Sequence, residues 1–355
     1  MVCAEWLYKT LIFNTYDMKK IFIKIRNFYR DHKKIINTVL RTVISLGLII
    51  YLVITQFKDF RTITATLKDI SIPLILLSAA THFYGIWITA FRWQTLLKTQ
   101  GVRLSILSLS SSVLVGQFFN NFLPTSIGGD VYRAYDVNKK SGFPMSSSIS
   151  VLVVERLSGI IASGLFAAAA LFFGFTAIGG KSIVIPIIIF LVLSIFLFFL
   201  ILNPNILGLH KLAKKIKFLQ KVLDKLKNVY DTFLSFKNHK WVLVQVIFYS
   251  LTLQFAVIIN YWLASKSLGI PLNLEVFIFI VPVVSIISML PISLGGIGVR
   301  EGSLVFLMVS LGAQNAKAAM CSLLLFAMLL VMGIIGGLIY AIRPLLAKKE
   351  SGRLV

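Results

Sequence analysis

Long apolar runs, separated by short polar segments, form the pattern of the whole chain. They occupy residues 39–57, 72–91, 104–123, 149–176, 183–202, 242–264, 274–294 and 317–342, and a shorter run covers 303–312. A helix of about 20 apolar residues is long enough to cross a bilayer, so the pattern predicts an all-α, polytopic integral membrane protein. Only 14% of the residues are charged, against roughly 25% in soluble domains, and the mean hydropathy of +0.88 agrees with this class.

One string within these runs occurs twice, once in each half of the chain. Residues 123–133 and 290–300 both fit L-P-x-S-[I/L]-G-G-x-x-x-R. Pro and paired Gly break helices, and an Arg is costly inside a membrane. A broken helix that carries a charge, once in each half of a membrane protein, is typical of a transporter's binding site.

The positive charges indicate how the runs cross the membrane. Lys and Arg gather in residues 1–38, in the loop 203–241 and after residue 342, and the positive-inside rule places all three in the cytoplasm. If every run crossed, five crossings would precede the loop 203–241 and place it outside. This conflict disappears if the two motif-bearing runs are re-entrant hairpins, 104–148 entering from the cytoplasm and 270–315 from outside. Six runs then cross, and 29 of the 36 Lys and Arg lie inside. The sequence therefore predicts an inverted repeat, with about six spanning helices plus two re-entrant hairpins, or eight membrane segments.

The same pattern divides the chain into three parts. Residues 1–38 form a basic cytoplasmic segment, 39–342 the membrane domain, and 343–355 a basic cytoplasmic tail. Within the domain, residues 205–240 carry an apolar stripe flanked by Lys, which predicts an amphipathic helix on the cytoplasmic interface; a coiled-coil or partner-binding helix is the alternative. We expect a multi-pass protein of the cytoplasmic (inner) membrane, with both termini in the cytoplasm.

The motif copies supply the candidate binding residues. Arg133 and Arg300 are equivalent, and a guanidinium can hold a phosphate with two hydrogen bonds. The glycines allow close backbone approach, and a helix that starts after them offers free N–H groups to an anion. The candidates in the motif regions are Gly128, Gly129, Asp130, Arg133, Gly295, Gly296, Arg300 and Glu301. The alternative is structural, with Asp130–Arg133 and Arg300–Glu301 pairing only to brace the hairpins.

Other charged and aromatic residues lie near these segments. Glu155 and Arg156, close to the start of a spanning run, are further candidate binding residues. They could instead form a structural ion pair with the motif charges across the bundle, and Asp130 or Glu155 could carry a proton. The cluster Arg92, Trp93 and its neighbours fits an aromatic belt with cations reaching the interface.

Several function classes have no support in the sequence. Four scattered His and the isolated Cys3 and Cys321 offer no metal-ligand spacing, so we expect no metal and no cofactor. No nucleotide-binding or hydrolase motif occurs, and we expect no enzyme activity. The basic charge is explained by cytoplasmic loops that face anionic lipid, without nucleic-acid binding.

Four segments, in order, resemble one known family. They are Arg92-Trp93 with Leu96-Leu97, then Leu123–Tyr135, Glu155–Gly159 and Pro291–Ser303. Together they resemble the flippase-like family of the lysylphosphatidylglycerol synthase transmembrane region, over residues 38–342. In two-part members this region flips the lipid that a cytosolic domain makes. Because the sequence ends at Val355, we expect a stand-alone member without that cytosolic domain.

The resemblance implies movement of an anionic or aminoacylated phospholipid, or a related glycolipid or isoprenoid lipid, between leaflets. The expected partner is membrane lipid with an anionic head group; a homo-oligomer and a separate lipid-modifying enzyme stay open. Two alternatives remain. One is a membrane-embedded enzyme or accessory subunit of glycolipid or cell-envelope synthesis, and the other is a secondary transporter of a small anion.

Overall fold

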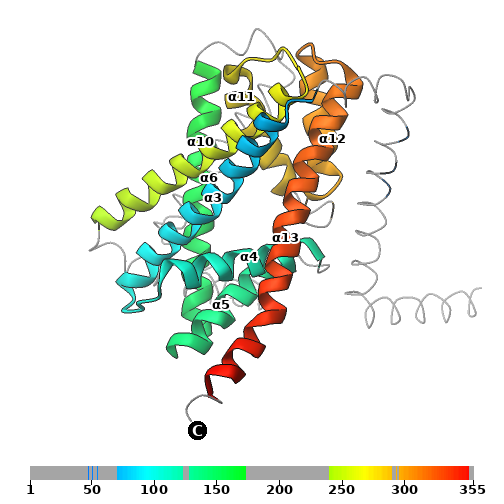
Figure 1. The fold of residues 1–355 in the computed structure, drawn as a ribbon. Coiled ribbons are helices and arrows are strands. Elements are labelled where there is room, and N and C mark those ends of the chain that lie inside the picture. Colours follow the sequence, from blue (N-terminus) through cyan, green and yellow to red (C-terminus); the bar gives the residue numbers. More distant parts are fainter. Residues whose placement is uncertain are drawn as a thin grey trace, which may run out of the picture.

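The computed structural model describes residues 47, 50, 54, 70–122, 128–172, 240–289, 293 and 296–351. In this part of the chain the structure is helical and contains no strand (Figure 1). Its helices are α3 (Ile72–Thr99), α4 (Ile106–Phe122), α5 (Gly128–Ser141), α6 (Met145–Phe172), α10 (Lys240–Ser267), α11 (Leu274–Met289), α12 (Val299–Ser310) and α13 (Asn315–Ser351). The predicted all-α class is confirmed.

Four of these helices are long and apolar enough to cross a membrane. They are α3, α6, α10 and α13, with apolar stretches at Ile72–Thr99, Met145–Ala170, Trp241–Ser267 and Asn315–Arg343. They match four of the six runs predicted to cross. The other two predicted crossings, 39–57 and 183–202, and the predicted amphipathic helix 205–240 lie wholly or almost wholly outside the described residues.

The helices form two repeats of the same design. Helices α3 and α10 both have 28 residues, and α10 follows α3 at the same sequence offset at which α11 follows α4. The two motif copies, which begin at Leu123 and Leu290, recur at almost the same offset. Each repeat therefore consists of a long helix, two short helices joined by the motif, and another long helix. The repeat predicted from one short string extends over four helices.

The contacts between helices also repeat in the two halves. In both repeats the first long helix packs on the first short one, the two short helices pack on each other, and the second short helix packs on the last long one. Across the repeats, α4 packs on α13 as α11 packs on α6. Almost every contact thus has a counterpart when the repeats are exchanged.

The equivalent helices α3 and α10 pack against each other in antiparallel directions. The Ser71 amide donates to the Ser267 carbonyl at 2.9 Å. Further along α3, the Ser78 hydroxyl donates to the carbonyl of Asn260 at 2.9 Å. A Cβ on Gly85 would lie 3.2 Å from Leu253. Because equivalent helices point in opposite directions, the two repeats are inverted.

The first motif copy joins two helices that fold back on each other. The Gly129 amide donates to the Asn120 side chain at 2.8 Å, near the tip of the α4–α5 hairpin. Towards its open end the Ser112 hydroxyl reaches the Asp136 carboxylate, and Lys140 donates to Ser108 at 2.8 Å. At 17 and 14 residues, these helices are about 25 and 21 Å long, shorter than the roughly 30 Å apolar core of a bilayer.

The second motif copy joins α11 and α12 in the same way. Gly296 and Gly298 have φ of 79° and 83°, a backbone region that residues with a Cβ rarely adopt. A Cβ on Gly296 would lie 3.0 Å from the Ser288 carbonyl oxygen. In Figure 1 this hairpin lies in the upper half of the molecule and α4–α5 in the lower half. The hairpins therefore enter the bundle from opposite ends, as the inverted repeat predicts.

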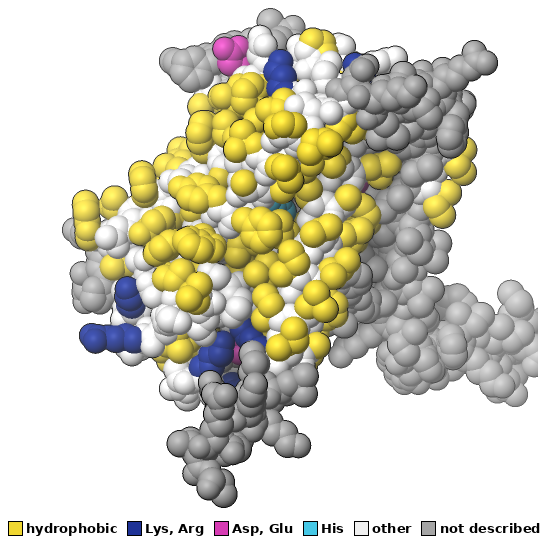
Figure 2. All heavy atoms as spheres, viewed as in Figure 1, with side chains coloured by type: hydrophobic (Ala, Val, Ile, Leu, Met, Phe, Trp, Pro, Cys, Tyr) yellow, Lys and Arg dark blue, Asp and Glu magenta, His cyan; other side chains and the backbone are white. Residues whose placement is uncertain are grey.

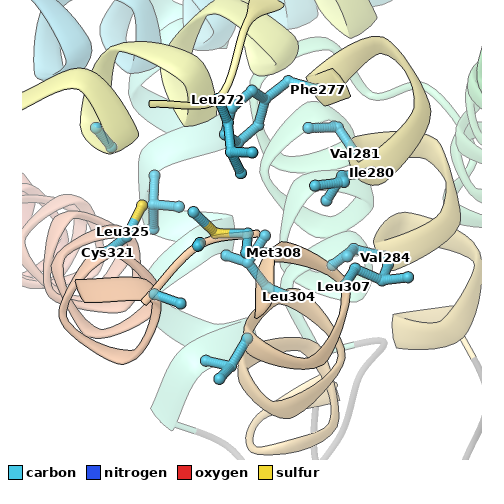
Figure 3. Close-up of a cluster of buried hydrophobic side chains, with 14 of the residues drawn as sticks. Leu272, Phe277, Ile280, Val281, Val284, Leu304, Leu307, Met308, Cys321 and Leu325 are labelled. Atoms are coloured by element: carbon cyan, nitrogen blue, oxygen red, sulfur yellow. The ribbon is translucent and has the colours of Figure 1, made fainter. Parts of the chain in front are cut away.

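Each hairpin lies within its own apolar cluster. One cluster joins α11, α12, the end of α10 and the start of α13, and includes Phe277, Ile280, Leu304 and Met308 (Figure 3). The other joins α4, α5, the first half of α6, the second half of α3 and the middle of α13, and includes Trp93. Outside these clusters, Figure 2 shows hydrophobic side chains over the middle of one face, with Lys and Arg towards its ends. That distribution is the one a bilayer requires.

Candidate functional site

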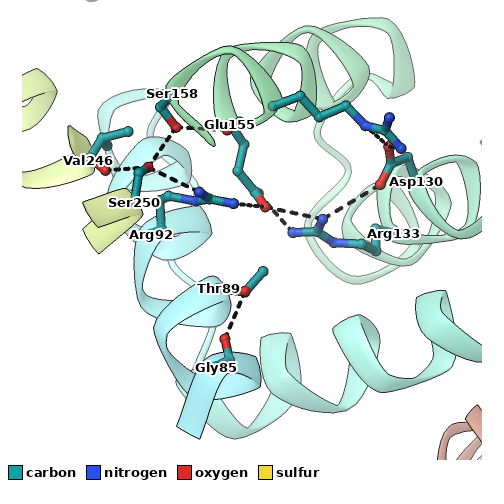
Figure 4. Close-up of polar contacts among 10 residues, drawn as sticks. Gly85, Thr89, Arg92, Asp130, Arg133, Glu155, Ser158, Val246 and Ser250 are labelled. Atoms are coloured by element: carbon teal, nitrogen blue, oxygen red, sulfur yellow. Dashed lines mark hydrogen bonds and ion pairs between the residues drawn. The ribbon is translucent and has the colours of Figure 1, made fainter. Parts of the chain in front are cut away.

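Three charged side chains meet inside the first repeat. Arg133 of α5 donates to both carboxylate oxygens of Glu155 on α6, with Nη2 2.8 Å from Oε2 and Nη1 3.3 Å from Oε1. Arg92 of α3 donates to Glu155 Oε1 at 3.0 Å (Figure 4). The three residues are at most 8% exposed. One carboxylate thus joins three helices, and we call these residues the Glu155 network.

Four further residues contact the two Arg side chains of the Glu155 network or their partners. The Arg133 guanidinium lies 4.2 Å from the centroid of the buried Trp93 ring, a cation–π contact. Asp130 is 3.6 Å from Arg133 and 2.6 Å from the more exposed Arg156. Arg92 also donates to the Ser250 hydroxyl at 3.0 Å. Within the described residues, both Nη groups of Arg133 therefore already have protein partners.

Glycine brings Arg133 to this position. A Cβ on Gly129 would overlap the carbonyl oxygen of Gly116 on α4, and a Cβ on Gly116 would lie 3.2 Å from the Arg133 side chain. The second glycine of the first motif copy therefore allows α5 to approach α4 closely, and Arg133, one turn further along, reaches the interior. Gly129 thus approaches another helix closely, and the ligand contact expected of the glycine pair stays a prediction.

The motif Arg of the second repeat has a different environment. Arg300 pairs with its neighbour Glu301, its Nε donating to Glu301 Oε1 at 2.9 Å. Glu301, which is 2% exposed, also accepts from the Gly298 amide at 2.6 Å. Glu301 is therefore fixed at the start of α12. The Nη1 of Arg300 makes no hydrogen bond with the described residues.

A partly open cavity of about 340 Å³ lies beside Arg300, between the two repeats. Its walls come from α3, α4, α10, α12 and α13. The polar lining consists of Thr81, His82, Thr89, Gln117, Gln254, Asn260, Tyr261 and Arg300, and the apolar lining includes Ile86, Val113, Leu253, Val257, Leu325 and Leu329. Among the described lining residues Arg300 is the one permanent charge. The cavity is amphipathic and has the size of a small-molecule site.

The predicted site residues therefore separate into two groups. The structure brings Asp130, Arg133, Glu155 and Arg156 together, and it places Arg300 and Glu301 beside the cavity. Arg133 is not among the described cavity residues. Of the predicted glycines, Gly128 starts α5, Gly129 and Gly296 lie at the hairpin tips, and Gly295 lies outside the described residues.

One sequence interpretation is wrong. Arg92 and Trp93 were expected in an aromatic belt at the membrane interface, but Trp93 is fully buried and Arg92 is 6% exposed. Arg92 belongs to the Glu155 network, and Trp93 packs against it. Trp87, 53% exposed, does face outwards as a belt residue would. The polar cavity residues Gln117, Gln254 and Asn260 were not predicted, because single amides in apolar runs are a weak signal.

No group of three or more potential metal-ligating side chains occurs in the described part of the chain. The charged groups that meet in the Glu155 network and beside the cavity are carboxylates paired with guanidinium groups. Such an arrangement is suited to ion pairing and anion contact.

Comparison with known proteins agrees with the architecture. The chain is 24% identical over 302 residues to the UPF0104 membrane protein PH1989 of Pyrococcus horikoshii, covering 79% of this chain and 90% of the relative. It is 24% identical over 254 residues to the UPF0104 membrane protein MJ1595 of Methanocaldococcus jannaschii, covering 67% and 74%. Residues 38–337 match the family described as the lysylphosphatidylglycerol synthase transmembrane region. The chain belongs to that family.

Proposed function

We propose that the protein moves an anionic or aminoacylated phospholipid, or a related glycolipid or isoprenoid lipid, between the leaflets of the cytoplasmic membrane. The observation that carries the proposal is the amphipathic cavity lined by Arg300, between two inverted repeats. An amphiphile requires a cavity with both polar and apolar walls. The apolar lining beside Arg300 could hold the apolar part of an amphiphile, which a small soluble anion lacks.

Arg300 is the proposed head-group contact. Its Nε and Nη2 are held by Glu301, which fixes the plane of the guanidinium and leaves Nη1 for a lipid phosphate. A hydrogen bond between two charged groups is stronger than one between neutral groups. Acyl chains would remain in the bilayer or lie against the apolar lining.

The Glu155 network has a different proposed role. Because Arg133 already contacts Glu155, Asp130 and Trp93, we assign it to holding the first hairpin against α3 and α6. The binding role expected of Arg133 from its motif position stays a prediction. With the hairpins held rigidly, one repeat can rock against the other, and the cavity between them would face each leaflet in turn.

The proposed activity breaks no covalent bond. The sequence contains no nucleotide-binding motif, so the proposed movement runs downhill or is coupled to an ion. The absence of bond breaking distinguishes the proposed transport from the alternative, an enzyme of glycolipid synthesis. Such an enzyme would form a new product, and transport would not.

Reconstituted vesicles provide the test. Vesicles with the purified protein and acyl-labelled fluorescent phosphatidylglycerol are treated with a membrane-impermeant quencher, and the slow phase reports leaflet exchange. We expect the wild type to exceed empty vesicles and Arg300→Gln to lose most of that gain. Arg103→Gln, at an exposed position, is the matched control and should keep the wild-type rate. Exchange that equals the empty-vesicle rate in the wild type, or that persists in a folded Arg300→Gln variant, would overturn the proposal.

A further inference from the structure

The cavity holds two polar side chains that the contact with phosphate does not explain. Gln117 projects from α4 in the first repeat, and Gln254 from α10 in the second. Arg300 can contact the phosphate of any phospholipid, so it cannot distinguish one head group from another. Selection between head groups requires other polar groups in the cavity, and the two glutamines are positioned to provide them.

A hydrogen bond from a neighbouring helix fixes the orientation of the Gln254 side chain. Its Oε1 accepts a hydrogen bond from the Ser163 hydroxyl of α6 at 3.0 Å. This contact leaves Nε2 as the group for another partner. The Nε2 is buried and has no hydrogen-bond partner in the described part of the chain. A buried donor without an acceptor is costly, which favours a ligand that supplies one.

In Gln117 the atom without a partner is an acceptor, whereas in Gln254 it is a donor. Its Oε1 is buried and likewise lacks a partner among the described residues. The two glutamines therefore offer the cavity one buried donor and one buried acceptor that lack partners among the described residues, from opposite repeats. What singles out these two atoms among the buried atoms without partners is that their side chains line the cavity. A polar ligand that both donates and accepts would satisfy the two together.

The chemistry of common head groups narrows the choice. A hydroxyl group donates one hydrogen bond and accepts others. With the phosphate at Arg300, a protonated amine could satisfy only the acceptor of Gln117 and a quaternary ammonium neither amide, whereas a hydroxyl can serve both. We therefore propose that the substrate is a phospholipid whose head group carries free hydroxyls, such as glycerol or a sugar, and that Gln117 and Gln254 select it. This inference rests on the proposed function.

The electrostatics of the site agree with a head group of low charge. Glu301 pairs with Arg300 from outside the lining, and the other polar lining residues are amides, hydroxyls and one His. Arg300 is thus the one permanent positive charge among the described lining residues, which suits one phosphodiester better than a multiply charged anion. One phosphodiester charge beside Arg300, with hydroxyls beside the amides, matches the groups present.

The test compares two lipids that differ only in hydroxyls. Acyl-labelled phosphatidylglycerol and phosphatidylpropanol have the same charge and chains, but propanol lacks the free hydroxyls of glycerol. Leaflet exchange of each is measured in vesicles containing the full chain. We expect the wild type to favour phosphatidylglycerol by about tenfold, the effect of one or two hydrogen bonds. In Gln117→Leu and Gln254→Leu this ratio should fall towards one.

A matched control and the contrary outcomes complete the experiment. Gln314→Leu makes the same change at an exposed position before α13 and should keep the wild-type ratio. Exchange of neither lipid by the wild type overturns the proposed function itself. Equal exchange of both lipids leaves the function in place and overturns the head-group selection. A wild-type ratio in both cavity variants, each eluting as a folded protein by size exclusion, overturns the assignment to the glutamines.

Discussion

Arg133 and Glu155 form a two-point ion pair, with Nη2–Oε2 and Nη1–Oε1 distances of 2.8 and 3.3 Å, inside the helical bundle. The motif Arg of the second repeat differs, because Arg300 pairs with the adjacent Glu301 instead. The first repeat thus uses its motif Arg to bind another helix, whereas the second leaves part of its Arg beside a cavity. Two copies of one motif have acquired different environments.

The ion pair gives a first prediction on stability. Glu155→Gln preserves the shape of the side chain but leaves the buried Arg92 and Arg133 without their shared carboxylate. Breaking a buried pair by removing one partner costs about 3–5 kcal/mol. We expect a clear fall in the thermal unfolding temperature of the purified protein in detergent, followed by tryptophan fluorescence.

Glu275→Gln is the control for this prediction. It makes the same chemical change at an exposed position in the first turn of α11 and should leave the unfolding temperature nearly unchanged. Equal unfolding temperatures for the two variants would show that the Glu155 network does not support the fold.

A second prediction concerns the contact between α13 and the first hairpin. A Cβ on Gly336 would overlap the carbonyl oxygen of Leu114 on α4. Close approach through small residues is a main source of helix association in membranes. Gly336→Ala should therefore force the helices apart and destabilise the protein by about 1–3 kcal/mol, the usual cost of overpacking.

Gly302→Ala provides the comparison, because nothing lies within 4 Å of the added Cβ there. Alanine in a helix is favoured over glycine by roughly 0.5–1 kcal/mol, so this variant should be neutral or slightly more stable. Expression as a folded monodisperse protein and the unfolding midpoint are measured for both. A stable Gly336→Ala variant would argue against the packing of α4 on α13.

The helical class, the membrane-spanning runs and the repeat could be predicted from the sequence for a physical reason. Hydropathy and charge depend on the chain alone, so the apolar runs and hairpin breaks are visible without a structure. The recurrence of one motif in both halves of the chain predicted the repeat, and the antiparallel packing of α3 on α10 confirms its inversion. That contact also agrees with the predicted crossing directions of these two helices.

The partners within the site could not be predicted in the same way. The side chains of Arg92 and Glu155 meet across 63 residues of sequence, and no local pattern specifies that pairing. Hydropathy also cannot separate a helix face that meets lipid from one that meets protein, because both are apolar. This is why buried Trp93 was assigned to the membrane interface, and why Gln117 and Gln254 gave no signal.

A third prediction concerns the open end of the first hairpin. Asp136, 5% exposed, accepts from Arg343 of α13 at 3.1 Å and from Lys140 at 2.6 Å. Asp136→Asn removes the charge that both cations face. Since hydrogen bonds to charged groups contribute about 1.5–3 kcal/mol, we expect a loss of that order, measured as the midpoint of a dodecyl sulfate unfolding titration.

Lys140→Ala separates the two contacts of Asp136. The Lys140 side chain is 29% exposed and can be solvated, so its loss should cost only about 0.3–0.5 kcal/mol, as for other i,i+4 pairs. If Lys140→Ala proves as damaging as Asp136→Asn, the contact between Asp136 and Arg343 is not the one that holds α13 to the hairpin.

The last prediction concerns membrane sides, which follow from the inverted repeat together with the positive charges. The exposed Lys139 lies at the open end of the first hairpin and the exposed Gln314 just before α13, at opposite ends of the bundle. The positive-inside rule places Lys139 in the cytoplasm. In a Cys3→Ser background, with Cys321 retained because it is buried, a membrane-impermeant maleimide should label Gln314→Cys in intact cells. Lys139→Cys should be labelled only after permeabilisation. The reverse labelling pattern would show that the protein has the opposite orientation in the membrane. Labelling of both cysteine variants without permeabilisation would contradict hairpins that enter from opposite sides.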